Sequence, residues 1–175
     1  MLKNKKSATG FTIVELLIVI VVIGILAAIT IVAFNGIQNR GYNSAVQSDL
    51  RSLATYIERQ KVLNGEVYPS TLAVADVKVS RNAYSRGYNN GTSWFNLLYC
   101  RNSIDPNAGY ALIAESKSGD VFQYSTYSGG LSKASFPIRA SATTCVDAGT
   151  PTITPGGTVV QWLYANDSWV ACMGV

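Results

Sequence analysis

The feature that most constrains this sequence is an apolar run near its beginning that carries no charge. The run covers the nineteen residues from Leu16 to Phe34. At about 1.5 Å per residue, a helix of this length spans the roughly 30 Å hydrocarbon core of a membrane. Glu15 stands at its start, where an unpaired carboxylate costs about 2 to 4 kcal/mol or must be neutralised. The run therefore predicts a membrane-spanning helix whose acid needs a partner.

The short segment before the run is polar and basic, and it contains Lys3, Lys5 and Lys6. No further lysine follows until Lys61, and this asymmetry predicts that the N-terminus stays in the cytoplasm. A secretory signal peptide has a different order, because its apolar region is only about 7 to 15 residues long and precedes the small-residue cleavage site. Here the small residue, Gly10, stands before the run.

This order of features resembles the leader of type IV prepilins and of the related pseudopilins of secretion systems. The matching residues before the apolar tail are Lys5, Lys6, Gly10, Phe11, Thr12, Ile13, Val14 and Glu15. The resemblance implies that a prepilin peptidase cuts between Gly10 and Phe11 on the cytoplasmic side, and that the new amine of Phe11 is methylated. It also implies that Glu15 pairs with the Phe11 amine of a staggered neighbouring subunit, which makes a costly carboxylate favourable on assembly. The alternative is an ordinary anchor in which Glu15 only marks the membrane interface.

Beyond the apolar run, an amphipathic pattern predicts that the helix continues. Val46, Leu50, Leu53 and Ile57 recur at spacings of three and four residues, which places them on one face of a helix. We expect a single helix over residues 11–63 that ends at Asn64-Gly65, because glycine adopts the left-handed conformation of a helix C-terminus. The predicted divisions of the chain are the leader (1–10), the membrane-spanning and filament-core half of the helix (11–37), its amphipathic half (38–64) and a head (65–175).

Many pilins have a proline about twenty residues after the cleavage site, where the helix melts or kinks in the filament. This chain has no proline from Ile29 to Ile37. Gly36, next to Asn35, is the only helix breaker there, and glycine costs about 1 kcal/mol against about 3 for proline. Any local melting is therefore expected at Asn35-Gly36, and the sequence does not decide whether it occurs.

The roughly 110 residues after the helix are enough for a single small head. We expect a connector over residues 70–77, either a short helix or an irregular loop, and a long loop over 80–92, followed by short strands separated by turn signals. The predicted strands are Trp94 to Cys100, Tyr110 to Glu115, Val121 to Thr126, Phe136 to Ala140, Val159 to Tyr164 and Trp169 to Met173. Such strands predict an antiparallel sheet with one face toward the helix. The expected fold class is α+β, the ladle fold of type IV pilins.

The three cysteines, Cys100, Cys145 and Cys172, all lie on the predicted exported side, where oxidation is permitted. An odd number leaves one unpaired, and the sequence does not determine the pairing. In the family that the leader resembles, a disulfide often closes a C-terminal loop. The resemblance therefore favours a Cys145–Cys172 disulfide with Cys100 as a buried thiol, and Cys100–Cys145 is the alternative.

The composition argues against enzymatic chemistry. Histidine is absent, which removes the commonest general base and metal ligand, and the acids of the head stand singly at turns. We predict no catalytic residue, cofactor or metal site. The net charge of +4 falls to about +1 without the three leader lysines. The positive charge of the whole chain therefore does not indicate nucleic-acid binding by the head. The 80–92 loop has aromatic and basic residues that could stack on DNA or pair with glycans: Arg81, Tyr84, Arg86 and Tyr88. Such residues on an exported head more commonly serve packing or subunit contact.

The resemblance implies a structural pilin subunit that crosses the membrane once and is then assembled into an extracellular pilus. Its implied partners are further copies of itself, the membrane, the prepilin peptidase and methylase, the inner-membrane assembly platform and minor pilins. The alternatives are a type II secretion pseudopilin and a membrane-tethered binding or enzymatic domain. The sequence does not separate a major from a minor subunit, or a role in adhesion from one in motility or DNA uptake.

Overall fold

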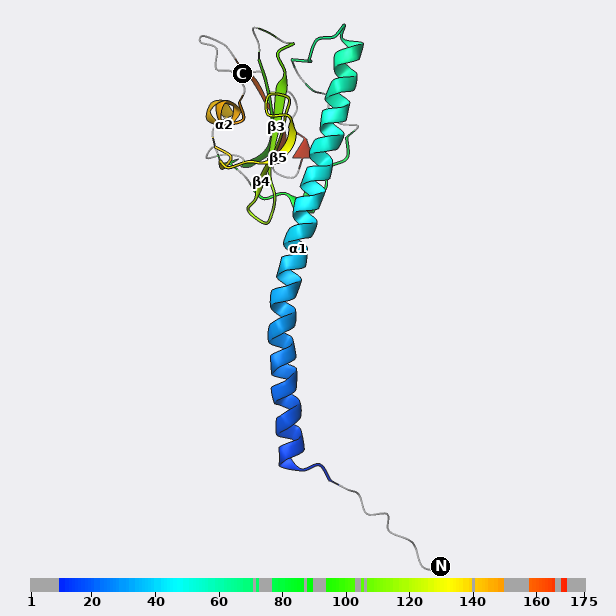
Figure 1. The fold of residues 1–175 in the computed structure, drawn as a ribbon, viewed down its shortest axis with the longest axis vertical. Coiled ribbons are helices and arrows are strands. Elements are labelled where there is room, and N and C mark those ends of the chain that lie inside the picture. The colour runs from blue at the N-terminus through cyan, green and yellow to red at the C-terminus, as the bar shows by residue number, and fades with distance from the viewer. Residues whose placement is uncertain are drawn as a thin grey trace, which may run out of the picture. The chain divides into compact units, whose positions relative to one another are not determined.

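The computed structural model consists of one long helix, an antiparallel sheet and two short helices (Figure 1). These elements lie within the residues that the structure describes, which are 10–70, 72, 77–86, 88–89, 94–102, 105, 107–139, 141–149, 158–165 and 168–169. The chain divides into two compact units, Met1–Gln38 and Asn39–Val175. We call the second the head unit.

Helix α1 (Ile13–Leu63) confirms the predicted long helix. It passes Asn35 and Gly36 as unbroken α-helix. At its C-terminus Gly65 has a φ of 72°, and the backbone amide of Glu66 donates a hydrogen bond to the carbonyl of Lys61 at 2.9 Å. This bond from the third residue past Leu63 back to the third-last helical residue closes a Schellman motif. The predicted end at Asn64-Gly65 is therefore confirmed, together with its cause.

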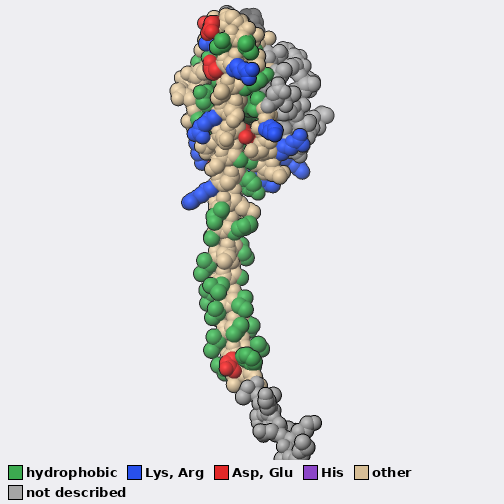
Figure 2. All heavy atoms as spheres, turned by 90° about the vertical axis from the view of Figure 1, so that its right-hand side faces the viewer, with side chains coloured by type: hydrophobic (Ala, Val, Ile, Leu, Met, Phe, Trp, Pro, Cys, Tyr) green, Lys and Arg blue, Asp and Glu red, His purple; other side chains and the backbone are tan. Residues whose placement is uncertain are grey.

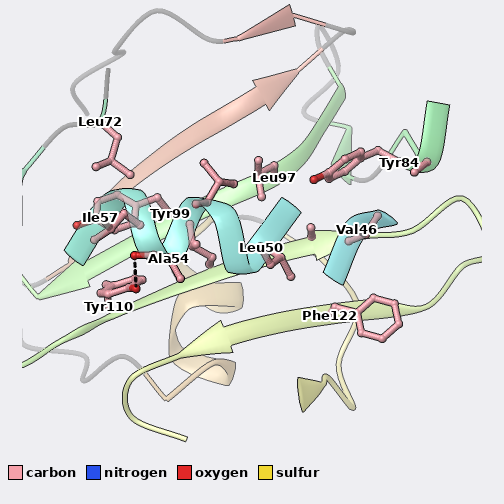
Figure 3. Packing of buried hydrophobic residues seen from close by; sticks show 14 of the residues in the cluster. Val46, Leu50, Ala54, Ile57, Leu72, Tyr84, Leu97, Tyr99, Tyr110 and Phe122 are labelled. Atoms are coloured by element: carbon pink, nitrogen blue, oxygen red, sulfur yellow. Dashed lines mark hydrogen bonds between the residues drawn. The ribbon is translucent and has the colours of Figure 1, made fainter. Parts of the chain in front are cut away.

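Within the head unit, the apolar stripe of α1 forms half of the main core. Val46, Leu50, Leu53 and Ile57 are completely buried, as their spacing predicted. They pack with side chains from one face of the sheet, including Leu97, Tyr99, Tyr110, Leu112 and Phe122 (Figure 3). The hydroxyl of Tyr110 also donates a hydrogen bond to the carbonyl of Ala54 on α1 at 3.3 Å. Burial of this stripe is the main hydrophobic contribution to holding α1 on the sheet.

The sheet is antiparallel throughout, with the strand order β5-β4-β3-β2-β6-β7, and β1 also pairs with β2. Its strands are β1 (Tyr88–Asn89), β2 (Trp94–Asn102), β3 (Tyr110–Glu115), β4 (Val121–Ser125), β5 (Gly130–Lys133), β6 (Thr158–Ala165) and β7 (Ser168–Trp169). Four predicted strands correspond to β2, β3, β4 and β6. The α+β fold class with a long N-terminal helix and an antiparallel sheet is confirmed.

The predicted strand from Phe136 to Ala140 is wrong, because residues 136–139 are not a strand. Strand β5 at Gly130–Lys133 was not predicted. Gly129 and Gly130 have positive φ angles of 85° and 110°, so the chain reverses directly after β4 and pairs at once. The predicted loop over 80–92 contains the 3₁₀ helix η1 (Arg81–Ala83) and β1. Helix α2 (Ser141–Asp147) was not predicted. Of the predicted strand 169–173, residues after Trp169 lie outside the described part.

Helix α2 covers the face of the sheet that points away from α1. In Figure 1 the orange α2 and the cyan part of α1 lie on opposite sides of the strands. Side chains that alternate with those of the main core, such as Leu98, Cys100 and Ile113, form a second buried cluster with Cys145 and Ala148. The head unit is therefore a three-layer structure, because alternate residues of β2 and β3 serve opposite cores.

This second core contains a disulfide between Cys100 and Cys145, with a Cα–Cα distance of 5.6 Å. The favoured Cys145–Cys172 pairing is therefore wrong, and the alternative is the one present. The physical reason is α2, which places Cys145 against the β2 face that carries Cys100. The prediction of a free thiol at Cys100 is also wrong, because Cys100 is in the disulfide. Cys172 lies outside the described residues.

Polar contacts fix the segment around η1 to α1. The carboxylate of Asp49 is buried and accepts hydrogen bonds from the backbone amide of Ser80 at 2.7 Å and from the hydroxyl of Tyr84 at 3.0 Å. Burial raises the pKa of Asp49, and these hydrogen bonds oppose that rise. Because a buried acceptor is costly without donors, the three groups hold one another in place.

A second polar connection joins α1 to the β3–β4 turn. The side-chain amide of Asn43 donates to Asp120 at 2.7 Å, and Lys133 forms an ion pair with the same carboxylate at 2.6 Å. The hydrogen bond from Lys133, followed by that from Asn43, lowers the pKa of Asp120. The hydroxyl of Ser118 donates to the Asn43 side-chain oxygen at 2.6 Å. These contacts position the turn beside the first part of α1 in the head unit.

Removal of the disulfide by the double substitution Cys100→Ala and Cys145→Ala is expected to lower the free energy of unfolding of the head. The two cysteines are 45 residues apart, and a closed loop of this size is worth about 4 kcal/mol in the chain-entropy estimate. Urea denaturation of the oxidised chain measures the loss. Cys172→Ala is the matched control and is expected to leave the midpoint unchanged. Equal destabilisation by Cys172→Ala alone would contradict the observed pairing.

Candidate functional site: the N-terminal motif

The candidate site is the segment that surrounds the expected cleavage position at the start of α1. Gly10 and Phe11 precede the helix and are exposed, and Phe11 has 88% of its surface accessible. The bond between them is therefore open to a peptidase in this structure. Lys5 and Lys6 of the predicted leader lie outside the described residues.

Thr12 and Glu15 form a reciprocal cap on the first turn of α1. The backbone amide of Thr12 donates to the Glu15 Oε2 atom at 2.8 Å, and the Thr12 hydroxyl donates to the same atom at 2.7 Å. In the other direction, the backbone amide of Glu15 donates to the Thr12 Oγ1 atom at 3.3 Å. Because α1 begins at Ile13, Thr12 is the N-cap and Glu15 is the third helical residue. This arrangement is a capping box, which satisfies amides that a helix start leaves without partners.

The capping box gives Glu15 a local role that the sequence reasoning missed. The signal for this role is the pattern Thr-x-x-Glu directly before an apolar run. The prediction for Glu15 covered only its cost in the membrane and its role in assembly. Both hydrogen bonds from Thr12 to this carboxylate end on Oε2. Among the residues that the structure describes, Oε1 has no donor, so the carboxylate can accept a further donor without losing the cap.

An exposed apolar surface follows the capping box. Large hydrophobic side chains from Leu16 to Ile37 have between about half and three quarters of their area accessible. Figure 2 shows hydrophobic side chains around this part of the helix, while Lys and Arg gather on the head. A segment of α1 is long and apolar enough to cross a membrane, with a mean hydropathy of 3.3. Exposure of this extent in a single chain marks a surface that lipid or protein covers.

The structure does not assemble the other ligand-binding candidates into one site. Tyr84 is buried and bonded to Asp49, whereas Arg81 and Arg86 are exposed at either end of its short segment. The side chain of Tyr88 lies outside the described part. Within the described residues, no group of three or more His, Cys, Asp or Glu side chains is arranged to hold a metal ion.

Comparison with known proteins connects this site to a class. The family model described as the prokaryotic N-terminal methylation motif matches residues 5–31, which contain Gly10, Phe11, the capping box and most of the apolar run. The chain therefore carries this N-terminal motif and is similar to a type IV pilus component. It is 29% identical over 106 residues to the type IV wide pilus major component PilA4 of Thermus thermophilus, an alignment that covers 51% of this chain and 81% of that relative. No solved structure matches the chain.

Replacement of Thr12 by alanine is expected to loosen the first turn of α1. The substitution removes the N-cap acceptor of the Glu15 amide, and losing an N-cap costs about 1 kcal/mol. Amide hydrogen exchange of residues 13–16, measured on the chain in detergent micelles, should accelerate by about fivefold.

Thr30→Ala is the matched control, because the Thr30 hydroxyl bonds only to the carbonyl of Ala27 in the middle of the same helix. It should leave exchange at the first turn unchanged. Unaltered exchange in Thr12→Ala would show that the capping box does not stabilise the helix start.

Proposed function

We propose that this chain is the structural subunit of a type IV pilus-like extracellular filament. The observation that carries the proposal is the uncovered apolar half of α1 that starts with Glu15 and follows a Gly10–Phe11 bond open to a peptidase. A soluble head needs no such surface, and in a simple anchor the acid would carry a cost in lipid that no neighbouring charge offsets. The similarity to a named pilus component supports the pilus over a secretion pseudopilus.

In the proposed sequence of events, the chain first inserts with its basic N-terminus in the cytoplasm. A prepilin peptidase then removes residues 1–10 and the amine of Phe11 is methylated, which preserves its positive charge. Assembly exchanges lipid around the apolar half of α1 for the helices of neighbouring copies. An assembly platform in the inner membrane and minor pilins are the partners that this process requires.

Glu15 supplies the proposed registry between subunits. The capping box already occupies its Oε2 atom with donors from Thr12, so the carboxylate is partly satisfied before assembly. The other oxygen is then the acceptor for the Phe11 ammonium of a staggered neighbour. A pair of opposite charges in an apolar bundle is stable only in the matched position, because removal of one partner leaves a buried charge uncompensated at about 3 to 5 kcal/mol.

Intact mass and N-terminal sequencing of the mature chain test the processing step. We expect a chain that begins at Phe11 and is heavier than the unmodified polypeptide by one methyl group. Gly10→Val serves as the control and should remain at its full length, because the small residue at the cut is lost. A mature protein that still begins at Met1 would contradict the proposal.

Replacement of Glu15 by leucine tests assembly. The variant should insert into membranes normally, since it removes a charge from the apolar run, but it should yield no long filaments in sheared fractions viewed by electron microscopy. The reason is the neighbour's Phe11 ammonium, which then lacks its partner at a cost of about 3 kcal/mol or more per contact.

Glu66→Gln is the control, because Glu66 is an exposed acid just past the end of α1 and should leave filament yield unchanged. Normal filaments from Glu15→Leu would contradict the proposed registry, and absence of any filament from the unaltered chain would favour the tethered-domain alternative. Short periplasmic assemblies from the unaltered chain, in place of long fibres, would identify a pseudopilin.

A further inference from the structure

A cavity at the C-terminal end of α1 contains a buried positive charge. The cavity has a volume of about 570 Å³ and is lined by Asn64, Val67, Tyr68, Pro69, Ser70 and Arg101. Arg101 lies on β2 and is only 7% exposed. A charged side chain this deeply buried normally has a counter-charge or a full set of acceptors, since removing it from water is costly.

The hydrogen bonds of Arg101 are incomplete. Its Nη1 atom donates to the backbone carbonyl of Tyr68 at 2.7 Å. Its Nε atom is buried without an acceptor. Among the described residues, an ion pair joins Lys133 and Asp120. No carboxylate of a described residue lies within ion-pair distance of Arg101. Of the described buried polar atoms that lack partners, the Nε of Arg101 is the one on a charged group.

The surroundings explain how the chain tolerates this charge without satisfying it. The carbonyl of Pro69 accepts a hydrogen bond from the hydroxyl of Tyr99 at 2.9 Å, whereas the guanidinium bonds to the carbonyl of Tyr68. The C-terminus of α1, whose last residue Leu63 adjoins the cavity residue Asn64, carries a partial negative charge that offsets part of it. Tyr127 also has a buried hydroxyl without a partner. Burial and the charge of Asp105 raise the pKa of Tyr127, while the Arg101 charge opposes them.

We propose that this cavity binds a carboxylate group through Arg101. Because Nε is buried in this structure, binding requires the side chain to turn this edge toward the cavity, where Nε and its neighbouring Nη present two parallel donors to the two oxygens of a carboxylate. Asn64 and Ser70 at the cavity wall add polar groups that orient the rest of the ligand. The carboxylate comes either from a free small molecule or from an acidic side chain of a second copy. The site itself does not depend on the proposed filament function.

The experiment observes the Nε–H group of Arg101 by NMR on the mature chain in detergent micelles, with the resonance assigned through bonds from the backbone. Glutarate is the probe, titrated at constant ionic strength, and glutaramide is its uncharged counterpart. We expect a saturable shift of the Arg101 signal with glutarate and none with glutaramide. The signal of Arg139, which is exposed, is the internal control and should not saturate.

Arg101→Lys retains the charge but loses the paired donors, and should weaken glutarate binding by about tenfold. Arg139→Lys is the matched control and should bind glutarate as the unaltered chain does. If Arg101→Lys fails to fold, the titration of the unaltered chain decides alone. An Arg101 signal that does not move, that follows Arg139, or that responds to phosphate but not to glutarate would overturn the proposal.

A dilution series of the chain without glutarate distinguishes the two sources of the carboxylate. An Arg101 signal that moves with protein concentration toward its glutarate-bound position identifies a second copy as the ligand. A signal that is independent of protein concentration but saturates with glutarate identifies a free carboxylate. Both outcomes support the site.

Discussion

The uncovered apolar surface at the beginning of α1 needs an environment that this chain alone does not supply. Side chains such as Ile13, Leu17 and Phe34 are more than half exposed, and water does not tolerate so long a contiguous apolar surface. Lipid or protein therefore covers this surface. The methylation motif and the similarity to a pilus component support the proposed exchange of lipid for neighbouring copies.

Further along, α1 uses a narrower apolar stripe to organise the head. Val46, Leu50, Leu53 and Ile57 bury completely against β2, β3 and β4, and the polar contacts of Asn43 and Asp49 fix the loops on either side. The opposite sheet face has its own cover in α2, locked by the Cys100–Cys145 disulfide. The same helix therefore supplies a surface for other molecules in one segment and a core for its own head in the next.

The start of α1 shows how one acid can serve two purposes. Glu15 caps the helix through Thr12, which supplies hydrogen bonds to a carboxylate that would otherwise have none in an apolar setting. An acid already held in a defined position loses less conformational entropy when it meets a neighbour's amine. The capping box and the proposed registry are thus compatible, because they use different oxygens of the carboxylate.

Local patterns in the sequence were sufficient for the long helix, its end at Gly65, four strands and the methylation motif, because each depends on residues close together in the chain. The capping box was equally readable from Thr12 and Glu15 and was overlooked. The disulfide partner of Cys145, helix α2 and the position of β5 were decided only by tertiary structure. Which sheet face Cys100 occupies, and what covers that face, depends on how distant segments pack. The buried charge of Arg101 belongs to the same group, since a residue's burial follows from its neighbours in space and not from its neighbours in sequence.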